Sequence, residues 1–313
     1  MSLRPARDAT PIRVAPARPW SRWESRLLPY LLLFPVLLTV GAVLLYPIAK
    51  NIWLSFHLLD YVRPQRGQRF VGLENYRELL VARDFWLGMG NTVVYTLGTV
   101  VGSFAIGLAT ALLLNERFPG RWLARTLTVL PWAIPYVAAV LIWTWIMDAE
   151  YGVLNYLLVK SGLVARKVPW LADPAYAMPA VLIVTIWKQF PFATVMLLAG
   201  LQTIPHTLYE AAHIDGAGRW HRFLQITLPG LRSVTAVVLI LLTIWAFRRF
   251  TIIYVMTGGG PARATETLPI QTYLQAFRYY NMGTAASLGT ISLLISMAVT
   301  LLYLWSLPRG EEM

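Results

Sequence analysis

The stretch EAAHIDGAGRWHRFLQITLPG, residues 210–230, separates two long apolar runs in a chain that is 57% hydrophobic. Ala211 and Ala212 follow Leu208 at i+3 and i+4, which places small side chains on one face of a short helix and allows close approach. Gly216 is expected to end that helix in the left-handed conformation. The pattern favours a helical hairpin that docks on another protein, with an ordinary amphipathic loop on the lipid surface as the alternative.

Six apolar runs are long enough to cross a membrane, since about 20 residues of helix span a ~30 Å hydrocarbon core. A mean hydropathy of +0.55 and only 13% charged residues exclude a soluble domain. We predict an all-α polytopic membrane protein over 27–307, with six transmembrane helices and a cytoplasmic hairpin at 202–230. The predicted spans are residues 27–49, 92–114, 126–147, 178–201, 234–256 and 285–307.

The charge distribution predicts the orientation of these spans. The net charge of +12 favours membrane anchoring over nucleic-acid binding, because arginines crowd the segment 1–26 that flanks the first span. We expect this Arg/Pro-rich tail to be disordered and cytoplasmic, which places both termini inside. The loops 115–125 and 202–233 are basic and agree, whereas 50–90 is basic on the expected outer side. The tail arginines are Arg4, Arg7, Arg13, Arg18, Arg22 and Arg26.

Two further segments have local signals of structure. FVGLENYRELL, residues 70–80, has the spacing of a short amphipathic helix on the outer surface. TGGGP, residues 257–261, resembles a phosphate loop only superficially, because no lysine follows a glycine there. We predict a turn at a helix exit, with Gly258, Gly259 and Gly260 free to adopt positive φ.

The sequence offers no recognisable catalytic or metal-binding motif. There is no cysteine, no H-E-x-x-H and no G-x-S-x-G. We therefore expect no catalytic residues, metal or cofactor in this chain. The six runs contain no Asp or Glu, which disfavours a proton-coupled transporter, although sodium coupling through backbone carbonyls stays open.

Three charges lie inside the runs, and each is a candidate pathway residue. For Lys188 the alternatives are contact with substrate and a structural hydrogen bond to a neighbouring helix. For Arg248 and Arg249 there are three alternatives. They gate the pathway or contact substrate, they contact a carbonyl or carboxylate of a partner subunit, or the predicted boundary of the span is misplaced. For three aromatic residues in the runs the alternatives are stacking on a ring of the substrate or, as we favour, anchoring of helices at the membrane interface; these are Trp143, Trp145 and Trp187.

The spacing of the opening stretch resembles the signature of permease subunits of ATP-binding-cassette importers. EAA at 210–212 precedes Gly216 by four residues, nine residues then lead to Ile226, and Leu-Pro follows at 228–229. FVGLENYRELL and TGGGPARATETLPIQTYLQAF (257–277) are similar to the carbohydrate-uptake branch of that family. The resemblance extends over the six predicted spans.

This resemblance implies a coupling helix seated in a cleft of a cytoplasmic ATPase; the matching positions are Glu210, Ala211, Ala212, Asp215 and Gly216. It also implies a second homologous permease subunit, two ATPase subunits that bind ATP and Mg, and an extracytoplasmic solute-binding protein. The location would be a bacterial or archaeal plasma membrane. With six predicted spans and no large extra outer domain, the chain departs from the eight-span maltose subunit and looks closer to the shorter sugar or glycerol-3-phosphate subunits. The resemblance implies a sugar, an oligosaccharide or disaccharide, as substrate, with glycerol-3-phosphate or another small polar solute as the alternative. An ion-coupled secondary transporter is the alternative from another class.

Overall fold

The computed structural model describes residues 22–62, 65 and 67–306. The chain divides into two compact units, Met1–Lys50 and Asn51–Met313. Most of the predicted tail lies outside the described residues, including Arg4, Arg7, Arg13 and Arg18. Its last residues are helical, because the first helix begins at Arg22.

The described part of the first unit is helical throughout. Its elements follow one another without a gap: α1 (Arg22–Val40), η1 (Gly41–Leu45) and α2 (Tyr46–Ser55), the last of which continues into the second unit. In η1 the Tyr46 N–H donates to the Gly41 carbonyl, five residues back. Pro47 follows, and because proline has no N–H to donate, the wider π turn lets the helix continue through it.

Within the described residues, four helices are long and apolar enough to cross a membrane, or six if two bent pairs each count as one span. The four are Leu28–Ser55, Arg83–Asn115 (α4), Pro174–Thr203 (α8) and Met282–Tyr303, which lies in α15 (Met282–Ser306). The bent pairs are α5 (Arg121–Ala133) with α6 (Tyr136–Ile146), at 97°, and Arg219–Gly230 with α12 (Arg232–Phe247), at 68°. The fold is a mostly helical membrane protein with four to six candidate spans.

The predicted fifth span, 234–256, is not one helix. α12 ends at Phe247, and Arg248 caps it with φ −95° and ψ 8°. A separate helix, α13 (Thr251–Thr257), follows. A continuous helix would hold two neighbouring guanidinium groups in apolar surroundings at a cost of about 2.5–3.5 kcal/mol each at the bilayer centre. The break instead places both arginines beside a cavity.

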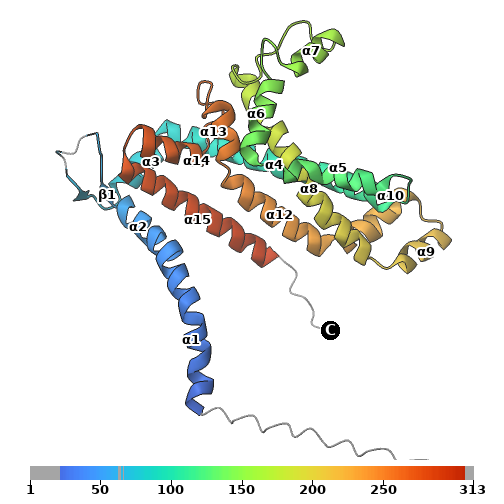
Figure 1. Cartoon of the computed structure of the whole chain (residues 1–313), viewed down its shortest axis with the longest axis horizontal. Helices are drawn as coiled ribbons and strands as arrows, with labels where there is room; N and C mark the ends of the chain where they lie inside the picture. Colours follow the sequence, from blue (N-terminus) through green and yellow to red (C-terminus); the bar gives the residue numbers. More distant parts are fainter. Residues whose placement is uncertain (1–21, 63–64, 66, 307–313) are drawn as a thin grey trace, which may run out of the picture. The chain divides into compact units, whose positions relative to one another are not determined.

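α4 and α8 form the most extensive helix pair of the second unit (Figure 1). Small residues on α4 permit the close approach, as is typical of helices in lipid. A Cβ at Gly107 would lie 2.5 Å from the Cβ of Ala193, and one at Gly102 would clash with Ile186. Alanine at Gly107 would therefore push the two helices apart.

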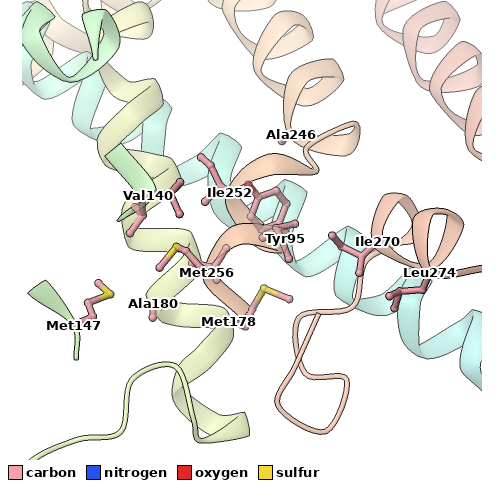
Figure 2. Close-up of a cluster of buried hydrophobic side chains, with 13 residues drawn as sticks. Tyr95, Val140, Met147, Met178, Ala180, Ala246, Ile252, Met256, Ile270 and Leu274 are labelled. Carbon is pink, nitrogen blue, oxygen red and sulfur yellow. The ribbon is translucent and has the colours of Figure 1, made fainter. Parts of the chain in front are cut away.

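A buried apolar cluster joins the helices around the α12–α13 break (Figure 2). Tyr95 of α4 is 1% exposed, and its hydroxyl pairs with the Thr185 hydroxyl of α8 at 2.9 Å. Ile252 and Met256 of α13 pack in the same cluster as Val140 of α6. Residues on both sides of the break therefore pack against α4, α6 and α8.

The shorter elements agree with their sequence signals. The helix predicted in FVGLENYRELL is α3 (Glu74–Val81), with Leu79 buried but Leu73 and Leu80 exposed. After α13 the chain turns at Gly258 and Gly259, with φ of 60° and 95°; Gly260 does not adopt positive φ. The remaining elements are the antiparallel pair β1 (His57–Leu58) and β2 (Arg69–Phe70), α7 (Val153–Lys160), α14 (Leu268–Tyr273) and η4 (Leu274–Arg278).

Candidate functional site

The segment 202–230 contains the turn predicted at Gly216. Its elements are α9 (His206–Ile214), α10 (Arg219–Arg222), η3 (Phe223–Thr227) and α11 (Leu228–Gly230). Gly216 has a φ of +78°, which confirms the prediction of a left-handed residue. Its N–H donates to the His213 carbonyl at 3.1 Å, and the Ala217 N–H donates to the Ala212 carbonyl at 2.9 Å. These two bonds form a Schellman motif, which fixes the direction of the chain after the helix.

A side-chain hydrogen bond ties α9 to the segment that leads into α12. The hydroxyls of Tyr209 and Thr227 lie 3.0 Å apart, and Thr227 is buried. Leu231, just before α12, is fully buried in a second apolar cluster with Leu197 of α8. These contacts connect α9 to the start of α12 and to α8.

The predicted coupling residues lie on the surface of α9 and its turn. Ala212 is half-buried, and the exposed ones are Glu210, Ala211, Asp215 and Gly216. The sequence analysis missed a large apolar side chain among them. Ile214 is 86% exposed, at the last position of α9 between His213 and Asp215. An isoleucine directly before Asp-Gly, at the expected end of the helix, was the available signal.

Lys188 is held by the end of a broken helix. It is 1% exposed, and its ammonium donates to the carbonyls of Pro131 (2.7 Å), Trp132 (3.1 Å) and Ile134. These carbonyls lie in the last turn and cap of α5, where no helical N–H reaches them because Pro135 ends the helix. A cation there also complements the helix dipole. Of its two sequence interpretations, the geometry matches the structural hydrogen bond.

Arg248 and Arg249 lie at the α12–α13 break and line a cavity of about 450 Å³. Within the described residues, neither forms an ion pair or a side-chain hydrogen bond, and the Nε of Arg249 is buried without a partner. The Arg249 guanidinium lies 4.9 Å from the centroid of the Tyr136 ring, and the Lys188 ammonium lies 4.8 Å from it. Tyr136 therefore brings two of the predicted pathway residues together. The cavity wall consists of Trp132, Tyr136, Gln189, Ile244, Trp245, Arg248, Arg249, Phe250 and Thr251.

The three tryptophans considered as sugar-stacking residues do not line this cavity. Trp143 and Trp187 form an edge-to-face pair with centroids 5.5 Å apart. Trp145 is 75% exposed, as expected of an interfacial anchor. The tryptophans that line it are instead Trp132 and Trp245, which no sequence signal singled out.

A further polar cluster fixes the loop after α13. The Arg263 guanidinium binds Glu266 through two hydrogen bonds of 2.9 Å and also pairs with Asp84 at the start of α4. The hydrogen bonds that Arg263 donates to Glu266 and then to Asp84 raise its pKa above the usual range. Asn91 donates to the carbonyls of Arg263 and Glu266 from α4. These contacts bind the loop to α4, and the three charged residues also line a cavity of about 530 Å³.

Residues 98–310 match the family model described as the binding-protein-dependent transport system inner membrane component. The chain belongs to this family. It is therefore a transporter permease of the inner membrane and not an enzyme. The match includes the α9 segment, Lys188 and the α12–α13 break.

Curated relatives extend the similarity to almost the whole chain. The sulfoquinovosyl glycerol transport system permease protein SmoG of Agrobacterium fabrum is 40% identical over 91% of this chain and 92% of its own length. The trehalose/maltose transport system permease protein MalF of Thermococcus litoralis is also 40% identical, over 90% of this chain and 94% of its own.

A solved structure agrees in fold. It is a bacterial ABC transporter involved in the import of the acidic polysaccharide alginate, and one of its chains aligns with a TM-score of 0.78. The alignment covers 91% of this chain and 96% of that one at 22% identity. The arrangement of helices described above is therefore shared with a chain of that transporter.

Proposed function

We propose that this permease forms half of the pathway for a sugar and that α9 couples the pathway to a separate ATPase. The coupling role is supported by one observation: α9 is exposed, ends in an apolar side chain, and is hydrogen-bonded to the segment that leads into α12. Ile214 projects from α9, and the Tyr209–Thr227 hydrogen bond joins α9 to the chain entering α12. The exposed small residues Ala211 and Gly216 allow a partner surface to approach closely.

The proposed substrate class is a sugar, an oligosaccharide or a disaccharide. The names of the relatives given above support it, because both include a sugar and both relatives align along nearly their whole length. Glycerol-3-phosphate or another small polar solute is the alternative within this family. An ion-coupled secondary transporter is less well supported, because it would give the α9 segment no partner.

The proposed assembly contains a second homologous permease subunit, two ATPase subunits and an extracytoplasmic solute-binding protein. ATP and Mg would bind the ATPase subunits. Counting each bent pair as one span gives six spans, which puts both termini on one side of the membrane. The basic segments 1–26, 115–125 and 202–233 favour the cytoplasm as that side. The α9 hairpin then faces the cytoplasmic ATPase, in a bacterial or archaeal plasma membrane.

The test is co-purification with the products of neighbouring genes. We expect the ATPase to co-purify with the wild-type chain and to be lost from Ile214→Glu, because a carboxylate cannot be buried unpaired in an apolar contact. Leu163→Glu is the matched control: Leu163 is 75% exposed in the loop after α7, and its replacement should leave the ATPase bound. Equal retention of the ATPase in both variants would contradict the role of α9.

A further inference from the structure

The cavity beside the α12–α13 break concentrates positive charge. Arg248 and Arg249 line it, and the Lys188 ammonium lies 4.8 Å from the ring centroid of Tyr136, which forms part of its wall. Within the described part of the chain, no Asp or Glu lines this cavity. Like charges held close together repel one another, so a bound anion is favoured there.

The two arginines are available to a ligand in a way that Lys188 is not. Three carbonyls already hold the Lys188 ammonium. Arg248 is exposed, and the buried Nε of Arg249 has no partner. A guanidinium presents a planar fork of N–H donors that matches the oxygens of a carboxylate, sulfonate or phosphate.

The rest of the wall suits a sugar ring. The side chains of Trp132, Trp245 and Phe250 offer flat apolar surfaces for the C–H faces of a pyranose. The Oε1 atom of Gln189 is buried without a hydrogen-bond donor and can accept from a hydroxyl. The volume of about 450 Å³ falls within the range of small-ligand sites.

We infer that this cavity binds a sugar that carries an acidic group, with the anion on Arg248 and Arg249 and the ring against the aromatic side chains. This inference rests on the proposed function, since it specifies the substrate class of the same pathway. Its rival is a carboxylate of the second permease subunit that neutralises the arginines in the assembled complex.

The experiment measures ligand binding to the detergent-purified complex. The probes are glucose, glucuronate, 6-deoxy-6-sulfoglucose and inorganic sulfate, followed by calorimetry or thermal shift. We expect saturable binding of the two acidic sugars, at least about 10-fold tighter than glucose or sulfate. Arg248→Gln and Arg249→Gln should each weaken that binding by about 10- to 100-fold. Arg166→Gln, which removes an exposed arginine outside the cavity, should leave it unchanged.

Several results would overturn the inference. They are the absence of saturable binding by either acidic sugar, glucose binding as tightly as they do, sulfate binding as tightly as the sulfonated sugar, or wild-type affinity in both arginine variants. Loss of the second permease subunit from the arginine variants would establish the interface carboxylate instead. ATP-dependent uptake of a neutral sugar that neither variant impairs would refute the acidic substrate and leave the importer intact. Failure of the ATPase to co-purify, by contrast, would refute the proposed function itself.

Discussion

Two helix breaks within the predicted spans contain positive charge, and they differ in how that charge is satisfied. At the break between α5 and α6, Lys188 donates to three backbone carbonyls and is 1% exposed. At the break between α12 and α13, Arg248 and Arg249 have no such acceptors among the described residues and line a cavity. At the first break the cation finds its hydrogen-bond acceptors within the chain. At the second break the guanidinium N–H donors stay available to a ligand or to a partner subunit.

The comparison shows that a charge inside an apolar run has two different meanings. A cation with internal acceptors stabilises the fold, because it satisfies carbonyls that a broken helix leaves open. A cation without them marks a ligand or a partner. The variants below should separate these meanings by whether folding or uptake is lost.

Lys188→Met should have the largest effect, on stability. Its replacement leaves the carbonyls of Pro131, Trp132 and Ile134 without donors in apolar surroundings, at a cost of about 3 kcal/mol or more. We expect a lower melting temperature and little assembled complex in detergent. Lys160→Met, on an exposed residue of α7, is the control and should resemble wild type. A normal melting temperature for Lys188→Met would show that Lys188 does not stabilise the fold, and the two breaks would then not differ as described.

The double variant Arg248→Gln with Arg249→Gln should show the opposite pattern. Complex yield and melting temperature should stay close to wild-type levels, because no ion pair or hydrogen bond among the described residues is lost and Arg249 gives up only its contact with the Tyr136 ring. Uptake at low substrate concentration should fall about 10-fold or more, since charge-assisted hydrogen bonds to substrate disappear. The measurement is uptake in proteoliposomes normalised to complex content. A loss of stability equal to that of Lys188→Met would show that both breaks are structural.

Gly216→Val should have a smaller effect than the arginine variants, and the effect should be confined to the turn after α9. A β-branched residue resists the φ of +78° by about 1–2 kcal/mol, which should misdirect α9. We expect reduced uptake with ATP hydrolysis no longer stimulated by substrate, and a normal amount of protein in the membrane.

Gly218→Val is the matched control for Gly216→Val. Gly218 lies two residues away, has an ordinary φ of −66°, and a Cβ there meets nothing within 4 Å. Equal transport by the two variants would mean that the left-handed turn is not required.

The smallest effect concerns Asp148, which follows α6. The N–H groups of Tyr151 and Glu150 donate to its carboxylate and lower its pKa from the ordinary 3.8. Because the folded pKa is the lower one, its contribution is present above pH 3.8 and is lost as the pH falls through the folded pKa. Hydrogen-exchange protection of this turn, corrected for intrinsic rates, should decrease slightly in acid. Asp148→Asn should remove that pH dependence, and an unchanged dependence would contradict it.

How much could be predicted from the sequence depends on the range of each interaction. The long helices and the Gly216 turn follow from local rules of hydropathy and of glycine conformation, and both were found. The acceptors of Lys188 are 54 to 57 residues away, so no local pattern identifies them. The break at Arg248 contains neither proline nor glycine, so no helix-breaking residue marks it, and the adjacent arginines alone do not predict where the helix stops. The cavity and its aromatic wall depend on that break, so they could not be predicted either.

The most direct test of the account is sugar uptake by the reconstituted complex with its ATPase subunits inactivated by substitution. Proteoliposomes would contain this chain, the second permease and the inactive ATPase, with ATP inside and the solute-binding protein outside. We expect uptake only with the active ATPase, because we propose that α9 couples substrate movement to ATP hydrolysis. Uptake that continues at the same rate with the inactive ATPase would contradict the account.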